Sequence, residues 1–312
     1  MELKQAEAYS VQRMILERKN KKRFNVEKLI PVMLFLTAAI SVFTTIGIVF
    51  TLIFETFIFF EKVSIVEFFT NGKWLPFAAT PSYGIMPLVV GTLKIAVIAS
   101  LVAVPVGLAT AIFLSEYASE KTRRVVKPIL EVLAGIPTIV YGFFALTFVT
   151  PVLRDLFPFL EMFNALSPGI VVGIMIMPMI ASLSEDALIS VPKSIREGAY
   201  ALGATKLETT IKVVLPAAVS GIVASIVLAI SRAIGETMIV SVAGGSTPSV
   251  SMDVTSSIQT MTAYIVQVSS GDAGYGTTIY YSIYAVGMTL FAFTLIMNLL
   301  AQFISRRYRE EY

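Results

Sequence analysis

Arg232 and Glu236 are two ionisable residues inside the apolar stretch SRAIGETMIV. If the surrounding membrane helix begins near Pro216, a rise of about 1.5 Å per residue puts Arg232 roughly 24 Å along it, at or beyond the bilayer midplane. An ionised side chain there costs at least about 2.5–3.5 kcal/mol, so such residues usually face the protein interior or a water-filled path. The planar fork of Arg suits oxyanions, and a spacing of four residues predicts both side chains on one helix face. The pair therefore predicts an anion path.

A structural alternative is that Arg232 and Glu236 simply neutralise each other. Their order counts slightly against this, because Glu before Arg is the better arrangement at that spacing. Desolvation also makes a fixed salt bridge in lipid expensive. Glu236 could instead accept a proton from a protonated oxyanion, or hold Arg232 when the path is empty. A third intramembrane charge, Lys94, is expected to extend to the outer interface.

Composition excludes most other chemistry. Hydrophobic residues make up 56% of the 312 residues and charged residues 14%, with a mean hydropathy of +0.80, whereas soluble domains carry about 25% charged residues. The chain has no Cys and no His, which removes thiolate metal sites and the commonest general base. It also lacks the G-x-x-x-x-G-K-[ST] phosphate-cradling loop. We expect an integral membrane protein that is not an enzyme, binds no metal or cofactor and does not bind nucleic acid.

Six mostly apolar stretches reach the length of about 20 residues that a transmembrane helix needs. They run over residues 29–54, 88–115, 132–153, 162–184, 213–240 and 274–305. The first is too long for the apolar region of a signal peptide, so it is predicted to be a true membrane helix. The predicted fold is an all-α integral membrane protein with six transmembrane helices. No internal repeat is visible, so any symmetry must come from a second subunit.

Basic residues predict the orientation, because cytoplasmic flanks carry an excess of Lys and Arg. Nineteen of them fall in the N-terminal tail, the 116–131 and 185–212 loops and the C-terminal tail, whereas the alternate loops hold only Lys62, Lys73 and Arg154. Both termini are therefore predicted to be cytoplasmic. The predicted organisation is a cytoplasmic basic tail (1–28), a first transmembrane helix (29–60), an external loop (61–86), a main transmembrane domain (87–306) with a cytoplasmic loop (185–216), and a cytoplasmic tail (307–312).

One polar segment, EGAYALGATKLETTIKVVLP at 197–216, interrupts the apolar pattern. Glu197 is expected to start a short helix, Gly203 to break it, and Leu215-Pro216 to close the segment before the next membrane helix. The outer 243–273 region is rich in Gly, Ser, Thr and Pro, and we expect irregular loops or short helices there. A polar helix and turn between two membrane helices indicates a surface that another protein binds.

The 197–216 segment resembles the cytoplasmic coupling motif of ABC importer permeases. That motif reads Glu-Ala-Ala, then Gly four residues on, then Ile-x-Leu-Pro; here Gly198 replaces the first Ala and Val213 replaces the Ile. In this family the short helix docks in a groove on the ATPase subunit. The resemblance implies an ATPase-coupling role for Glu197, Gly198, Ala199, Leu202, Gly203, Ala204, Leu215 and Pro216.

The resemblance extends over about residues 84–305 to the phosphate-specific branch of these permeases. It is carried by LAGIPTIVYGFFAL, by GTLKIAVIASLVAVPVGLATAIFLSEYA and by RAIGET. Ser-Glu-Asp at 184–186 and Glu236-Thr237-Met238 are similar to the C-type subunit of that branch. The resemblance implies a MetI-like, type I importer bundle and a phosphate-path role for Arg232 and Glu236. It also implies a homologous A-type permease subunit, two ATPase subunits that use the ATP, and an external phosphate-binding protein.

The sequence therefore predicts the permease subunit of an ATP-driven importer of inorganic phosphate in a prokaryotic cytoplasmic (inner) membrane, in contact with membrane lipid. One alternative is import of another oxyanion, such as molybdate or sulfate. Phosphate can be protonated and can then donate a proton to Glu236, which favours phosphate. A stand-alone secondary transporter is a second alternative, and the 197–216 motif and the lack of an inverted repeat count against it.

Overall fold

The computed structural model describes residues 24–307 and divides after Phe54 into two units, Met1–Phe54 and Glu55–Tyr312, each described by itself. In the first unit, the described residues belong to α2 (Phe24–Lys62), an apolar helix whose last turns lie in the second unit. Apart from residues 24–28 and Arg307, the predicted tails 1–28 and 307–312 lie outside the described residues.

Six helical runs are long and apolar enough to cross a membrane, which confirms the predicted all-α class and the number of transmembrane helices. The first is α2. The others are α4 (Met86–Ile112) with the π-helical segment η1 (Phe113–Tyr117); α6 (Thr138–Phe144) with η2 (Ala145–Val149) and α7 (Thr150–Leu156); α8 (Leu166–Ile189); α10 (Lys206–Thr209) with η3 (Thr210–Val214) and α11 (Leu215–Ile234); and α14 (Thr278–Arg307).

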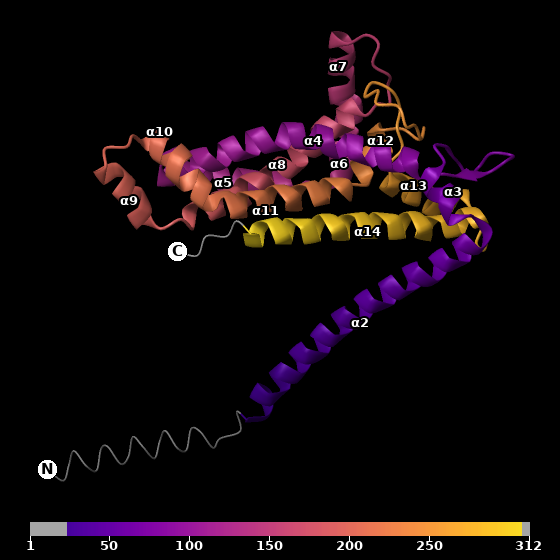
Figure 1. The fold of residues 1–312 in the computed structure, drawn as a ribbon, viewed down its shortest axis with the longest axis horizontal. Coiled ribbons are helices and arrows are strands. Elements are labelled where there is room, and N and C mark those ends of the chain that lie inside the picture. Colours follow the sequence, from indigo (N-terminus) through magenta and orange to yellow (C-terminus); the bar gives the residue numbers. More distant parts are fainter. Residues whose placement is uncertain (1–23, 308–312) are drawn as a thin grey trace. The chain divides into compact units, whose positions relative to one another are not determined.

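Four long helices of the second unit, α4, α8, α11 and α14, run side by side (Figure 1). The main core lies around α8, where Met175, Ile176 and Ile180 are almost completely buried. Close backbone approach makes this packing possible: a Cβ at Gly173 of α8 would lie 2.8 Å from the Val102 Cβ of α4. Small residues at such contacts are the usual means by which membrane helices gain dispersion contacts.

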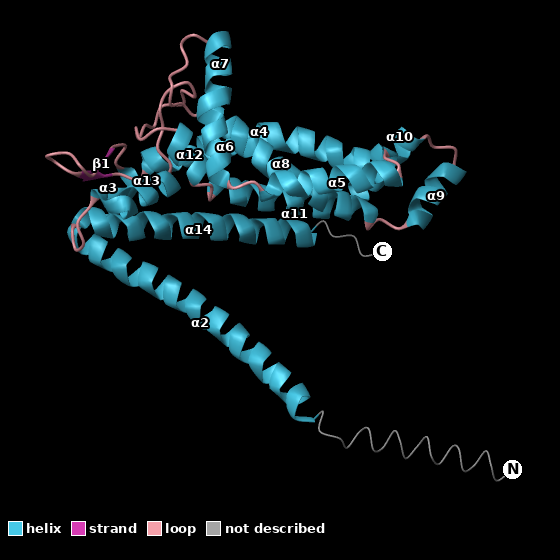
Figure 2. Cartoon of the chain, turned by 180° about the vertical axis from the view of Figure 1, so that it is seen from behind, coloured by secondary structure: helices cyan, strands magenta, loops and turns pink. Residues whose placement is uncertain are grey.

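The two ends of this unit carry different short elements (Figure 2). One end carries α5 (Glu120–Gly135), α9 (Lys193–Ala201) and α10. The other carries α3 (Ile65–Thr70), the antiparallel strands β1 (Trp74–Leu75) and β2 (Ser82–Tyr83), α12 (Met238–Ala243), α13 (Met261–Gln267) and the π-helical η4 (Val268–Asp272). Trp74 pairs with Tyr83 across the strands and contacts the Tyr264 ring edge-on at 4.8 Å, which fixes the small sheet to α13.

Two of the six predicted stretches contain a helix break and do not form one continuous helix. The third transmembrane helix begins at Thr138 and not at 132, because Ile136 and Pro137 are extended and separate it from α5. Residues 120–135 therefore form a helix of their own, in which Leu130 is the buried residue. The fifth predicted stretch, 213–240, is not one helix, since α11 ends at Ile234 and α12 begins at Met238.

Two π-helical segments each end two residues before a proline. The Thr150 N–H donates to the Ala145 carbonyl just before Pro151, and the Leu215 N–H donates to the Thr210 carbonyl just before Pro216. A proline inside an α-helix clashes with the carbonyl four residues earlier and has no N–H to donate. A widened turn with a five-residue step lets the helix continue through this position. Pro216 therefore does not interrupt the run from α10 into α11.

Candidate functional site

The polar segment folds as a helix, a turn and a second helix, which we call the α9–α10 loop (Lys193–Thr209). The helix begins at Lys193, four residues before Glu197, so the prediction that Glu197 starts it was wrong. It ends at Ala201, and Gly203 then adopts φ +84°, a conformation that favours glycine. The Ala204 N–H donates to the Ala199 carbonyl at 3.1 Å and closes the turn. The predicted break at Gly203 is confirmed.

The second helix of the loop carries its own N-terminal cap. The Glu208 N–H donates to the Thr205 hydroxyl at 3.3 Å, and the Thr205 N–H donates to the Glu208 carboxylate at 3.0 Å. This reciprocal capping box satisfies two backbone donors at the start of α10. From there the chain continues without a break through Leu215 and Pro216 into α11. The turn is thus fixed on both sides, by Gly203 and by the cap.

The residues of the α9–α10 loop point mainly outward. No residue of α9 is buried, and the Leu202 side chain is 91% exposed. Tyr200 and Leu207 are also large exposed apolar side chains. The predicted coupling residues divide by exposure: Ala199, Ala204 and Leu215 are half-buried, and the exposed ones are Glu197, Gly198, Leu202, Gly203 and Pro216. The loop therefore presents exposed apolar side chains on a backbone of fixed shape. Little of this chain covers them.

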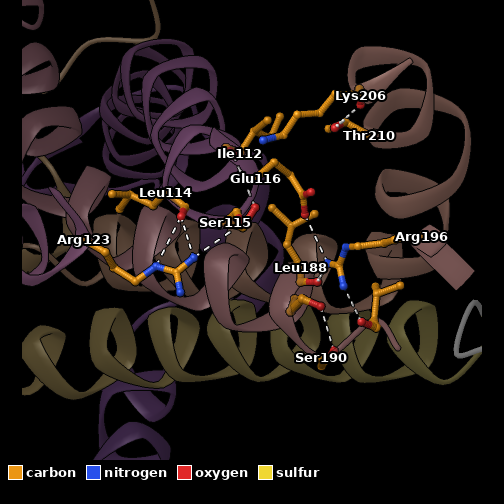
Figure 3. Close-up of polar contacts among 12 residues, drawn as sticks. Ile112, Leu114, Ser115, Glu116, Arg123, Leu188, Ser190, Arg196, Lys206 and Thr210 are labelled. Carbon is orange, nitrogen blue, oxygen red and sulfur yellow. Dashed lines mark hydrogen bonds and ion pairs between the residues drawn. The ribbon is translucent and has the colours of Figure 1, made fainter. Parts of the chain in front are cut away.

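Arg196 ties the loop to the bundle, and sequence reasoning missed it (Figure 3). Its guanidinium donates to the Val191 carbonyl at 2.6 Å, to the Leu188 carbonyl at 2.7 Å and to the Glu116 carboxylate at 3.1 Å. Leu188 and Val191 lie at the end of α8, where helix carbonyls lack partners. Glu116 lies in η1, eighty positions away in sequence. The only sequence signal was that both residues are charged and close to predicted membrane ends.

A second arginine holds η1 from the side of α5. Arg123 donates to the Leu114 carbonyl at 2.7 Å and to the Ser115 carbonyl at 3.3 Å (Figure 3). It also pairs with the Glu185 carboxylate at 3.1 Å. Glu185, in α8, is fully buried, and Lys127 of α5 pairs with its second oxygen at 3.2 Å. Two cations thus offset the cost of burying one carboxylate.

Lys127 also donates to Asp186 at 3.3 Å. Partial burial lowers the pKa of Lys127, but the neighbouring Glu185 and Asp186 carboxylates outweigh it and hold the pKa above its ordinary value. Lys127 therefore stays charged at neutral pH. Arg123 and Lys127 thus join η1, α5 and α8 through ion pairs and hydrogen bonds.

The membrane pair Arg232 and Glu236 is not arranged as predicted. Because α11 ends at Ile234 and Gly235 caps it, Glu236 lies beyond the helix that carries Arg232, and the prediction of one shared helix face was wrong. Within residues 24–307, no ion pair joins the two side chains. Arg232 is exposed at the surface of the chain, whereas Glu236 is 8% exposed. Mutual neutralisation is therefore not what keeps these charges in place.

Glu236 is held by the segment that follows it. Its carboxylate accepts the Ile239 N–H at 3.2 Å at the start of α12, and its carbonyl accepts the Thr262 hydroxyl at 2.7 Å from α13. Thr262 in turn lies 3.0 Å from the Thr260 hydroxyl. We call residues 235–262, from the end of α11 to the start of α13, the outer segment. It packs against α4, where the Met261 N–H donates to the Thr92 hydroxyl at 3.1 Å.

Lys94 of α4 also belongs to this packing. Its ammonium donates to the Asp253 carbonyl at 2.9 Å, and the residue is only 6% exposed. Lys94 thus reaches toward the outer segment but is covered by it, so the expectation that it extends to an interface was wrong. Hydrogen bonds from Thr255 lower the pKa of the exposed Asp253 carboxyl, which therefore stays ionised near Lys94. Among the described residues, no group of three or more Asp or Glu side chains could hold a metal ion.

Residues 103–310 match the family described as "Binding-protein-dependent transport system inner membrane component". This match covers more than half of the chain and includes the α9–α10 loop, Arg232 and Glu236. The chain belongs to this family. The permease is therefore a multi-pass membrane component of a transport system that depends on a binding protein, and it is a transporter subunit rather than an enzyme.

Related permeases cover most of its length. It is 36% identical over 248 residues to the probable ABC transporter permease protein YqgH of Bacillus subtilis, covering 78% of this chain and 79% of that protein. It is 34% identical over 262 residues to the phosphate transport system permease protein PstC of Xylella fastidiosa, with 78% and 79% covered. A probable PstC of Methanocaldococcus jannaschii is 31% identical over 275 residues, with 80% and 84% covered.

Solved structures show the same fold. A bacterial ABC transporter involved in the import of alginate aligns with a TM-score of 0.60 at 16% identity, covering 93% of this chain and 100% of that chain. The MetNI methionine ABC transporter, in an inward-facing conformation, aligns with a TM-score of 0.55 at 19% identity, covering 72% and 98%. The permease thus has the MetI-like fold that the sequence resemblance implied.

Proposed function

We propose that this permease is the C-type membrane subunit of an ATP-driven importer of inorganic phosphate. The observation that carries the proposal is the α9–α10 loop: its shape is fixed by Gly203 and the Thr205 cap, yet its apolar tip at Leu202 is 91% exposed. A rigid, exposed apolar tip fits a pocket on a partner, as binding hot spots do. The ATPase of the importer is the partner that couples there.

Phosphate is the proposed cargo because relatives that cover most of the chain are phosphate transport permeases. Arg232 supplies the positive charge for an oxyanion path, and its exposure leaves its guanidinium open to a ligand or to a neighbouring subunit. A bidentate guanidinium is the side chain best matched to phosphate oxygens. Molybdate or sulfate remains the alternative cargo.

The proposed complex contains a homologous A-type permease subunit, two ATPase subunits that use ATP, and an external phosphate-binding protein. In this assembly the permease holds no cofactor of its own. The α9–α10 end faces the cytoplasm, together with both termini, because the basic flanks lie on that side. The end with α3, β1, β2 and α13 then faces the binding protein.

The coupling proposal is tested with Glu197→Lys, an exposed change on the α9–α10 loop. We expect the variant complex in liposomes to lose phosphate-stimulated ATPase activity, because the reversed charge lies on the proposed docking surface. Glu120→Lys on α5, also exposed, is the matched control and should keep it. Wild-type stimulation in Glu197→Lys would refute the coupling role of the loop.

The cargo proposal is tested by uptake of labelled phosphate, sulfate and molybdate into the same liposomes. We expect phosphate uptake alone to depend on ATP. Glu236→Gln then separates the two roles of the carboxylate: the amide oxygen can still accept the Ile239 N–H, but it cannot take a proton from phosphate. A large loss of uptake in this variant supports proton acceptance, and full uptake leaves only the structural role at α12.

A further inference from the structure

The π-helical segment η1 lies between two arginines at the cytoplasmic end of the bundle (Figure 3). Arg123 from α5 donates to its Leu114 and Ser115 carbonyls, and Arg196 from α9 pairs with its Glu116 carboxylate. Both arginines also bind α8, through Glu185 and through the Leu188 carbonyl. Since η1 is the continuation of α4, its position sets where this long transmembrane helix ends.

The attachment of α9 to this region is narrow. Within the described residues, Arg196 makes every side-chain hydrogen bond from α9 to the rest of the chain. The main apolar attachment is Ile195, which is partly buried against the apolar cluster that contains Leu188 and Val191. Beside them a cleft of about 350 Å³ opens between η1 and α9. The helix that carries the coupling motif is therefore not packed broadly onto the bundle.

The Arg196–Glu116 pair is largely shielded from water. Its side chains are only 16% and 6% exposed, so water weakens the contact little. A guanidinium with three acceptors has a defined orientation, unlike a flexible ammonium. A displacement of α9 would therefore act on the end of α8 and on η1 together, because Arg196 bonds to both.

We propose that Arg196 and Glu116 form the positioning pair that transmits movement of α9 to α4. This inference rests on the proposed function, in which the ATPase moves α9, and it names the residues that pass the motion on. Arg123 extends the same connection to α5. Neither Arg196 nor Glu116 touches the cargo or the exposed docking tip at Leu202 in this arrangement.

The test uses Arg196→Lys in the complete complex, because Lys keeps the charge but cannot hold three acceptors in the same geometry. We expect ATPase co-purification and basal ATPase activity to stay at wild-type level. The maximal phosphate-stimulated rate should fall about tenfold, within the range that substitutions along a coupling network produce, with an unchanged half-saturating phosphate concentration. Arg124→Lys on α5, an exposed arginine, is the control and should have no effect.

A second measurement covers the case in which Arg196→Lys disturbs folding. The chain has no native cysteine, so Glu116→Cys combined with Arg196→Cys can be joined by a reducible bifunctional thiol reagent without side reactions elsewhere in this chain. We expect the uncrosslinked pair to be uncoupled, the linked pair to recover stimulation, and reductant to abolish it again. Recovery of stimulation by the link, in a pair that co-purifies with the ATPase both before and after linking, separates transmission from a purely structural role.

Three outcomes would overturn the proposal. Wild-type stimulation in Arg196→Lys would show that the pair transmits nothing, and loss of co-purification together with failed rescue would show that it only supports the fold. If the wild-type complex itself shows no phosphate-stimulated ATPase, the proposed function fails and this inference fails with it. A stimulated wild type with unaffected variants removes only the role of Arg196 and Glu116.

Discussion

The α9–α10 loop and the outer segment contain glycines in almost the same conformation, Gly203 at φ +84° and Gly245 at φ +90°, but in opposite surroundings. A Cβ at Gly203 would meet nothing within 4 Å, whereas one at Gly245 would overlap the Ser257 hydroxyl and lie 3.0 Å from Phe163. The outer segment satisfies its polar groups internally, as Glu236 shows. In the α9–α10 loop, most side chains point away from the rest of the chain.

This difference indicates that residues of the two regions are needed for different purposes, one for folding and the other for binding a partner. In the outer segment, residues are fixed by contacts within the chain, so a substitution acts first on folding. In the α9–α10 loop, side chains such as Leu202 have almost no contacts within the chain, so a substitution acts on a partner. The two regions can therefore be told apart by asking whether stability or assembly changes.

The largest expected effect is that of Leu202→Asp. A carboxylate at the exposed tip would have to be desolvated on docking, and loss of an apolar hot spot typically costs about 2 kcal/mol or more, so ATPase binding should weaken about 30-fold or further. Thermal melting of the isolated permease should not change, because the side chain is 91% exposed. Pull-down with the purified ATPase measures binding, and Leu202→Met is the control. If Leu202→Asp pulled down as much ATPase as the wild type, the α9–α10 loop would not be the partner-binding region.

Much of the fold could be predicted because membrane helices need long apolar runs, and six of them were visible. The boundary at α5 could not, since its apolar residues join those of the next helix and only the extended Ile136-Pro137 pair separates the two. The break after Ile234 could not be predicted either, because apolar residues lie on both sides of it. The Glu236 carboxylate accepts the Ile239 N–H at the start of α12, and this local contact leaves no trace in hydropathy.

The coupling segment could be predicted in part, because the Gly203 turn depends on local backbone chemistry. The Arg196–Glu116 pair could not, since it joins residues eighty positions apart and no periodicity relates them. The sequence shows Arg232 and Glu236 as charges in an apolar stretch. Their spacing of four residues places them on one helix face only if the helix continues past both, and α11 ends at Ile234. Long-range contacts and helix breaks thus limit what spacing alone can predict.

The next effect in size is that of Gly245→Ala. Alanine at positive φ costs roughly 1 kcal/mol, and overlap with Ser257 and Phe163 adds an overpacking cost of roughly the same size. We expect the permease to lose about 2 kcal/mol of stability, seen as a lower melting temperature in detergent. Gly203→Ala is the matched control with equal φ and open space, and it should lose about half as much. Equal losses would show that packing around Gly245 contributes nothing.

The smallest expected effect is a gain, from Gly198→Ala. Gly198 lies inside α9, a Cβ there would meet nothing within 4 Å, and alanine is favoured over glycine in a helix by about 1 kcal/mol. Amide hydrogen exchange in α9 should slow by about fivefold, with little change in global melting, because no residue of α9 is buried in the bundle.

Alanine also stands at this position in the coupling pattern that the segment resembles, so a partner groove that accepts the pattern has room for the methyl group. Phosphate-stimulated ATPase activity should therefore be kept in Gly198→Ala. If exchange slows but stimulation is lost, the partner requires a bare backbone at Gly198. That result would place the docking contact on this face of α9, rather than at the Leu202 tip alone, because only a contact on that face can sense one added methyl group.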